Sequence, residues 1–376
     1  MAGIGFAPAL LFHSKAVFDG ITPSTKITPV GFTRMLLDNS KPNIVSSGID
    51  DGSGHIKDVR VKYRTRLPKG KSATTDNCDI DARPAYNEVT VAASMFRKYA
   101  VMLEDDVIAR YEKEASGLMN PIGTALSGVT PLMTEQWEVI METINGLMQD
   151  MNDDLVVKQV ANFGKNQTTG AATAKAVNFP LSAIVNDLTS GMTSVMADAR
   201  LNEMDISKSF IVGSGLIDAY YIQQNAAAIS ANQAGVNSNR LALPKYYNDF
   251  DCDNAWGTNE FGIFEKNAVQ LIDINRYVGF KAGMKGGDFF GTLTVPVMDA
   301  QGNMSSFTFD IQLTYIKCPT ELVIASEGDR AIKVNRGWAL IISKSFDSFN
   351  IPADAYDAAD RLTGNNGTLR YVATNA

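Results

Sequence analysis

The stretch "PLMTEQWEVIMETINGLMQDMNDDLVVKQVANF", residues 131–163, has the most regular pattern in the chain. Apolar residues recur in it at steps of three and four, which places them on one face of an α-helix. Pro131 favours the first turn of a helix, and Thr134 is a suitable cap. The pattern predicts a helix over residues 131–164, roughly 45 Å long at a rise of about 1.5 Å per residue. Methionines at this spacing are expected to fill a core. The apolar face comprises Met133, Trp137, Ile140, Met141, Ile144, Leu147, Met148, Met151, Leu155, Val156 and Val160.

The composition is that of a globular chain with few groups suited to catalysis. Of 376 residues, 45% are hydrophobic and 20% are charged, so a sizeable core can form. The two histidines, His13 and His55, lie near the N-terminus in segments expected to be irregular, which argues against catalytic triads and histidine-rich zinc sites. The net charge of −7 disfavours a protein that binds nucleic acid by neutralising phosphates. We therefore expect no catalytic residues, no cofactor and no membrane span.

The first hundred residues predict segments that extend away from a core. Residues 1–57 are rich in Gly, Pro, Ser and Thr, which predicts an extended arm that cannot bury itself well. The stretch "DVRVKYRTRLPKGK", residues 58–71, then alternates cations with other residues, as in a strand. A second β-prone run begins at Glu88. Two strands joined by a polar tip predict a projecting hairpin.

The alternation places four cations on one face of the first strand: Arg60, Lys62, Arg64 and Arg66. One interpretation is a solvated edge strand whose charge prevents aggregation. The other is a docking face for an acidic surface. An acidic segment with Glu104, Asp105 and Asp106 follows in the sequence and is the candidate counterpart, within one subunit or between two.

The stretch "NDFDCDNAWGTNEFGIF", residues 248–264, has the ligand spacing of a calcium-binding EF-hand loop. The carboxylates at loop positions 1, 3, 5 and 12 are Asp249, Asp251, Asp253 and Glu260. However, Asn254 replaces the glycine expected at position 6, and neither flank has a helical pattern. We therefore disfavour a metal site and predict an acidic surface turn that joins strands.

The remaining patterns mix helices and strands, which predicts an α+β protein. Residues 180–204 predict a helix, and a short β-run at 210–212 precedes another helix after Gly213. Residues 291–318 predict a β-hairpin with its turn at "DAQGN". Further strands are expected in "ELVIAS" and "GWALIISKSF", and the tail after Phe349 is expected to be weakly structured.

This order of parts resembles the major capsid protein of tailed bacteriophages, with the Hong Kong ninety-seven-type capsid fold that encapsulin shells share. The resemblance implies an α+β fold with an extended N-terminal arm, a projecting β-hairpin loop, a long spine helix and a mixed axial domain. It implies these regions: arm 1–57, extended loop 58–100, peripheral domain 101–179 with the spine helix at 131–164, axial domain 180–330, and return strands and C-terminal tail 331–376.

The resemblance also implies a function. A structural shell protein of this family is no enzyme; it self-assembles into hexamers and pentamers of an icosahedral capsid that encloses double-stranded DNA. Its implied partners are copies of itself and scaffolding, portal and decoration proteins, with DNA nearby but not bound sequence-specifically. Its implied location is the virion capsid, assembled in the bacterial host cytoplasm. In this setting Arg60, Lys62, Arg64 and Arg66 are expected to contact an adjacent subunit.

Three alternatives stay open from the sequence. An encapsulin-type compartment has the same fold in a cellular role. An unrelated cytosolic enzyme that uses carboxylates lacks a recognisable motif here. A calcium-binding structural protein rests only on residues 248–264.

Overall fold

The computed structural model has the mixed helices and sheets of the predicted α+β class. Three sheets are formed by the described residues, of five, three and six strands. The structure describes residues 31–39, 44–49, 56–64, 86–92, 95–103, 131–179, 191–221, 244–275, 281–282, 289–298, 304–327, 330–353 and 364–374.

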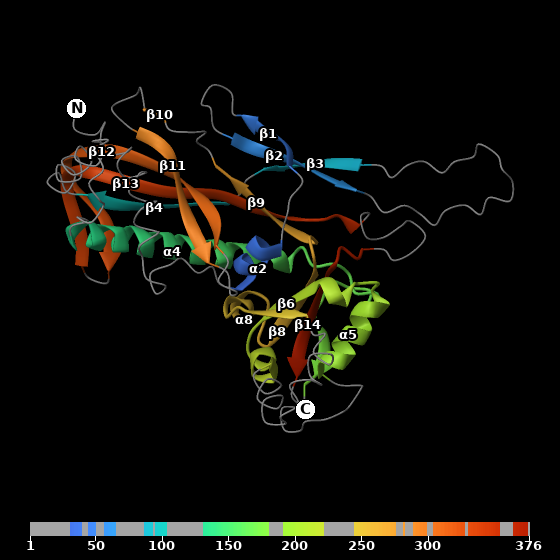
Figure 1. The fold of residues 1–376 in the computed structure, drawn as a ribbon. Helices are drawn as coiled ribbons and strands as arrows, with labels where there is room; N and C mark the ends of the chain where they lie inside the picture. The colour runs from blue at the N-terminus through green and yellow to red at the C-terminus, as the bar shows by residue number, and fades with distance from the viewer. Residues whose placement is uncertain are drawn as a thin grey trace, which may run out of the picture.

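The predicted long helix is confirmed as α4, Pro131–Val160. Its apolar face is buried from Ile144 to Val156, and Val160 packs partly buried against the same core, which agrees with core packing of the methionines rather than an open binding groove. The helix runs beneath the long strands of the main sheet (Figure 1). Its buried side chains in the described part are Ile144, Leu147, Met148, Met151, Leu155 and Val156.

The main sheet has the order β10-β11-β12-β13-β4. Its strands are β4 (Met95–Leu103), β10 (Lys281–Ala282), β11 (Phe289–Met298), β12 (Met304–Glu327) and β13 (Arg330–Asn350), and β9 (Val269–Ile274) also pairs with β13. The predicted hairpin at residues 291–318 is confirmed by β11 and β12, which pair antiparallel. Alternate residues of β13 (Leu340, Ile342 and Phe346) join the core that covers α4.

A small antiparallel sheet lies at one end of the main sheet, next to β9 (Figure 1). It consists of β1 (Ile44–Ile49), β2 (Ile56–Arg64) and β3 (Tyr86–Ala92). The pairing of β2 with β3 confirms the predicted hairpin. The last part of the predicted extended loop does not belong to this hairpin, because residues 95–100 lie in β4 of the main sheet.

A second core is built around a five-stranded sheet with the order β5-β14-β8-β6-β7. The strands are β5 (Lys175–Asn178), β6 (Ser209–Gly213), β7 (Lys245–Asn248), β8 (Glu260–Glu265) and β14 (Thr368–Thr374), with helix α5 (Gly191–Leu201) and the short η2 (Ile206–Lys208) alongside. Residues 216–221 are helical, as predicted after Gly213.

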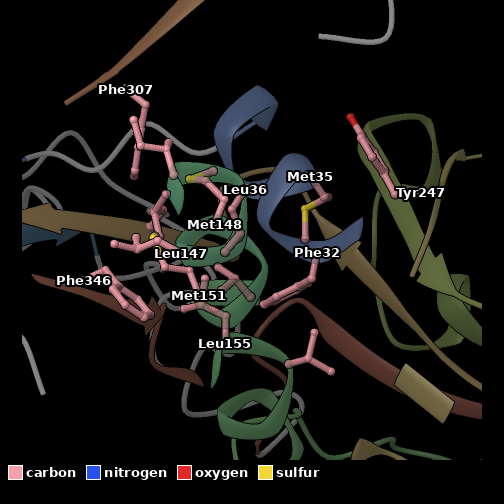
Figure 2. Close-up of a cluster of buried hydrophobic side chains, with 14 of the residues drawn as sticks. Phe32, Met35, Leu36, Leu147, Met148, Met151, Leu155, Tyr247, Phe307 and Phe346 are labelled. Carbon is pink, nitrogen blue, oxygen red and sulfur yellow. The ribbon is translucent and has the colours of Figure 1, made fainter. Parts of the chain in front are cut away.

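Two sequence-based expectations are wrong in part. The tail does not remain weakly structured, because β14 lies inside the five-stranded sheet with Leu369 and Tyr371 fully buried. The predicted arm is not extended throughout either. Its residues Gly31–Asn39 form helix α2, which buries Phe32 and Leu36 at i and i+4. Figure 2 shows these side chains gathered between α2 (blue) and α4 (green).

Candidate subunit interface

The outer face of the small sheet presents the predicted cations. Val59 and Val61 of β2 are buried and pack in a cluster with Ile272 of β9. Because side chains alternate along a strand, Arg60 and Lys62 point the other way, and Arg60 is exposed. The buried valines therefore fix which face of β2 meets solvent.

The strand register adds two residues to this face that the sequence analysis did not assign to it. Glu88 of β3 lies opposite Lys62, and Tyr86 lies opposite Arg64. The Nζ of Lys62 is 4.9 Å from the centroid of the Tyr86 ring, a cation–π distance. Tyr86 is 58% exposed, unusual for an aromatic residue of its size. The face thus combines cations, an anion and an exposed aromatic ring, and of these residue types Arg and Tyr are enriched at protein interfaces.

The remaining residues of the predicted interface are only partly described. Arg64 lies within β2, but its side chain is outside the described part. Arg66 and the acidic residues Glu104, Asp105 and Asp106 lie outside the described residues. Their pairing with the cations of β2 stays a prediction.

The acidic stretch 248–264 is not the predicted surface turn. Asp251–Ala255 form the short helix α8, and Asp249 is buried. The backbone N–H of Phe32 donates to Oδ2 of Asp249 at 2.7 Å, and Nδ2 of Asn152 donates to the same oxygen at 3.0 Å. Asp249 therefore caps the start of α2 from a distant part of the chain and fixes it against α4.

The four carboxylates with EF-hand spacing are bound by protein groups, and Nδ2 of Asn152 donates to both Asp249 and Asp251. Oδ1 of Asp253 accepts from the backbone N–H of Asn259 at 2.9 Å, and Glu260 forms an ion pair with Arg370. Within the described ranges, no group of three or more His, Cys, Asp or Glu side chains has the arrangement of a metal site. The carboxylate spacing therefore serves the packing of α8 and β8.

Asp153 on α4 and Asp251 on α8 form an acidic pair at this stretch. Asp153 is exposed, yet partial desolvation, a hydrogen bond with Asp251 and the charges of Asp251, Asp150 and Asp249 raise its pKa to about 7. Desolvation likewise raises the pKa of Asp249. The charged carboxylates at the junction of α4 and α8 therefore oppose one another at neutral pH.

This junction predicts a pH dependence of stability. The pKa of Asp153 is higher in the folded state than its usual value of about 3.9. At pH values between about 3.9 and about 7, the folded chain therefore binds a proton at Asp153 that the unfolded chain has lost. The contribution of protonated Asp153 to the free energy of unfolding is present at acidic pH and lost as the pH rises through about 7. We expect Asp153→Asn to raise the melting temperature at pH 8 and to flatten its decline between pH 5 and pH 8, measured by circular dichroism.

The matched control for this prediction is Glu142→Gln, which changes another exposed carboxyl of the same helix, about two turns or more from Asp153. It removes one negative charge without touching the pair, so its melting curve should keep the pH dependence of the unchanged chain. If both substitutions act alike, the effect comes from net charge and not from Asp153.

Comparison with known proteins finds similarity in structure but not in sequence. No protein family model matches the sequence, and no curated protein matches it. The chain is similar to the capsid structure of Cyanophage P-SCSP1u, with 12% identity, a TM-score of 0.38 and coverage of 95% of this chain and 89% of that chain. It is also similar to the capsid asymmetric unit of Cyanophage A-1(L), with 12% identity, a TM-score of 0.40 and coverage of 91% and 93%. The capsid structure of Staphylococcus phage Andhra matches with 9% identity, a TM-score of 0.37 and coverage of 91% and 86%.

All three matches are phage capsids. Separately, none of the helices within the described ranges is both long and apolar enough to span a membrane.

Proposed function

We propose that this chain is a structural shell subunit that self-assembles into hexamers and pentamers of an icosahedral phage capsid enclosing double-stranded DNA. The observation that carries the proposal is the small sheet: its inner valines anchor it to β9 and β13, while its outer face presents Arg60, Lys62 and Tyr86. A sheet anchored on one face and charged on the other suits contact with a neighbouring copy.

The rest of the described fold supports this role. The long sheet packed on α4 forms an elongated body (Figure 1) that can meet several neighbours along its length. Assembly on a closed lattice distributes binding over many contacts, so no single contact needs to be strong. The proposed role is structural, without an enzymatic reaction.

The proposed partners follow from the same role. They are copies of this chain and scaffolding, portal and decoration proteins, with packaged DNA nearby and no sequence-specific contact to it. The proposed location is the virion capsid after assembly in the bacterial host cytoplasm.

Electron microscopy of the purified full chain, alone and with its candidate scaffolding protein, tests the proposal. We expect closed shells with hexameric and pentameric units. A chain that stays monomeric in both samples, at concentrations where shell proteins assemble, would contradict the proposal.

Reversing the two described cations is expected to weaken assembly. In Arg60→Glu combined with Lys62→Glu, the outer face of β2 becomes acidic and repels the acidic surface proposed to receive it. We expect roughly a tenfold higher protein concentration to be required for shells, with the difference shrinking in high salt because surface charges are screened. Light scattering measures the assembly threshold.

The control reverses Arg200 and Lys266, two exposed cations near the five-stranded sheet. It makes the same change in net charge away from β2. Equal thresholds for the two double variants would mean that net charge, and not the face of β2, governs assembly.

A further inference from the structure

Lys344 is a lysine enclosed in the main core. It lies on the face of β13 that also carries Ile342 and Phe346, and its side chain is fully buried. Its Nζ is 4.5 Å from the centroid of the Phe307 ring. Figure 2 shows Phe307 and Phe346 in this core. An amine in such surroundings is costly unless partners satisfy it.

The partners of Lys344 come from two neighbouring strands. Its Nζ donates to Oδ1 of Asn275 at 2.8 Å and to the carbonyl oxygen of Thr308, and it forms an ion pair with Asp273. β9 pairs antiparallel with β13, with Ile274 opposite Ser345. The same register continued by one residue places Asn275 opposite Lys344, so the two form a cross-strand pair.

We propose that Lys344 and Asn275 are joined by an isopeptide bond that the folded chain forms by itself, with Asp273 as the proton-transferring group. The amine, the amide and a carboxyl group are the three components such a bond requires, and here they lie on adjacent strands in an aromatic environment.

The reaction needs no external reagent. Asp273 first takes a proton from the Lys344 ammonium, which leaves a neutral amine and a carboxylic acid. The Nζ lone pair then attacks Cγ of Asn275 and forms the new C–N bond. The bond from Cγ to Nδ2 breaks, one proton of Nζ passes through Asp273 to Nδ2, and Nδ2 leaves as ammonia. One amine and one primary amide thus become one secondary amide and ammonia.

The electrostatics of the site support the first proton transfer. Burial lowers the pKa of the Lys344 amine, and the charge of Asp273 only partly opposes this. Burial also raises the pKa of Asp273. Both shifts favour the neutral pair that the reaction requires. The Asp273 side chain is 33% exposed, whereas the Lys344 side chain is fully buried.

The position of the bond gives it a structural consequence. β12 pairs with β13 up to the pair of Asp310 and Ser343, and β9 pairs with β13 from Ser345 onward. Lys344 lies at the point where one neighbouring strand replaces the other. A covalent bond there would hold β9 to β13 where β12 ends its pairing with β13, and it would restrict the conformations of the unfolded chain.

Mass spectrometry of the denatured full chain tests the proposal. We expect the unchanged chain to be lighter, by the mass of one ammonia, than its sequence requires, and tryptic digestion to yield one branched peptide containing both Lys344 and Asn275. Trypsin should not cut after Lys344, because an amide replaces its amine.

Two variants serve as references. Lys344→Met removes the amine and keeps an apolar chain of similar length, and Asn275→Ala removes only the acceptor. Both should have their full sequence masses, and the Asn275→Ala chain should melt at a lower temperature than the unchanged one. Full mass in the unchanged chain, with the two peptides recovered separately, would overturn the proposal even if both variants failed to fold. Loss of water instead of ammonia would place the bond on Asp273 and would overturn the assignment of Asn275.

Discussion

Replacing Gly31 by alanine is expected to remove about 3 kcal/mol from the free energy of unfolding. Gly31 begins α2 with φ at +53°, a left-handed conformation that alanine adopts poorly. A Cβ at this position would also overlap the carboxylate of Asp249. That carboxylate cannot move away freely, because it accepts hydrogen bonds from Phe32 and Asn152. Alanine therefore either strains the turn or breaks the buried cap.

The loss of stability in Gly31→Ala is expected to affect more of the fold than α2. Phe32 is fully buried and its ring centroid lies 5.2 Å from that of Phe264 in β8. Displacing the start of α2 thus disturbs both α4, which supplies Asn152, and the five-stranded sheet, which supplies Phe264. Buried donors left without an acceptor add about 1–3 kcal/mol each.

Gly170→Ala is the matched control. Gly170 has a similar φ of +67°, but a Cβ there would meet nothing within 4 Å. Gly170→Ala therefore measures backbone strain alone, which is expected to lower the free energy of unfolding by about 1 kcal/mol. Urea unfolding of the unassembled subunit, followed by circular dichroism, measures both variants. Equal losses would show that the contact with Asp249 contributes nothing.

The parts that the sequence predicted correctly are those fixed by local periodicity. The steps of three and four in residues 131–160 need no distant partner to be recognised, so α4 follows from the sequence alone. The alternation in residues 58–66 likewise gives β2 and the outward direction of Arg60. The hairpin of β11 and β12 follows from alternation on both sides of a polar turn.

The parts that were missed depend on partners far away in the sequence. α2 has only nine residues in a segment rich in turn formers, and its stability comes from the core and from Asp249. In β14, Leu369, Tyr371 and Ala373 occupy alternate positions, as on one face of a strand. The polar composition of the tail around this short segment nevertheless predicted weak structure. Glu88 and Tyr86 could not be placed opposite Lys62 and Arg64, because the residues between the strands do not fix the register.

The site of Lys344 shows the same limit. No spacing in the sequence joins Asp273 and Asn275 to Lys344, which lies 69 residues beyond Asn275. Only the pairing of β9 with β13 brings them together. By contrast, the EF-hand spacing of residues 249–260 is local and conspicuous, yet its carboxylates pair with protein groups, and Asp249 and Asp251 share the amide of Asn152.

Replacing Asp198 by alanine is expected to cost about 4 kcal/mol. Asp198 on α5 is 4% exposed and joins four parts of the second core. It accepts from Nδ2 of Asn166 at 2.6 Å and from the Tyr371 hydroxyl of β14 at 2.9 Å. It also accepts from Thr168 and forms an ion pair with Lys175 of β5. Alanine would leave these donors, one of them charged, without their acceptor in a mostly buried site.

Asp205→Ala is the control that distinguishes the loss of the buried Asp198 network from the loss of a single exposed ion pair. Asp205 also has a lysine partner, Lys208 at 2.7 Å, and its hydrogen bonds to Lys208 and Ser207 lower its pKa, but the pair is exposed to solvent. Its loss is expected to change the melting temperature little, because exposed pairs are weak. A large effect from Asp205→Ala, or a small one from Asp198→Ala, would contradict the prediction.

The two residues also differ in what acid should do to the unfolding free energy. Burial alone would raise the pKa of Asp198, but its hydrogen bonds to Lys175, Thr168, Asn166 and Tyr371 outweigh burial, and the pKa is lowered. Its stabilisation is therefore full above the unfolded pKa of about 3.9 and is lost as the pH falls through the lower folded value. The difference in unfolding free energy between the unchanged chain and Asp198→Ala should thus be constant from pH 5 to pH 8 and should shrink below pH 4. A difference that instead grew in acid would mean that Asp198 is held as a carboxylic acid, and the ion pair with Lys175 would not be the basis of the network.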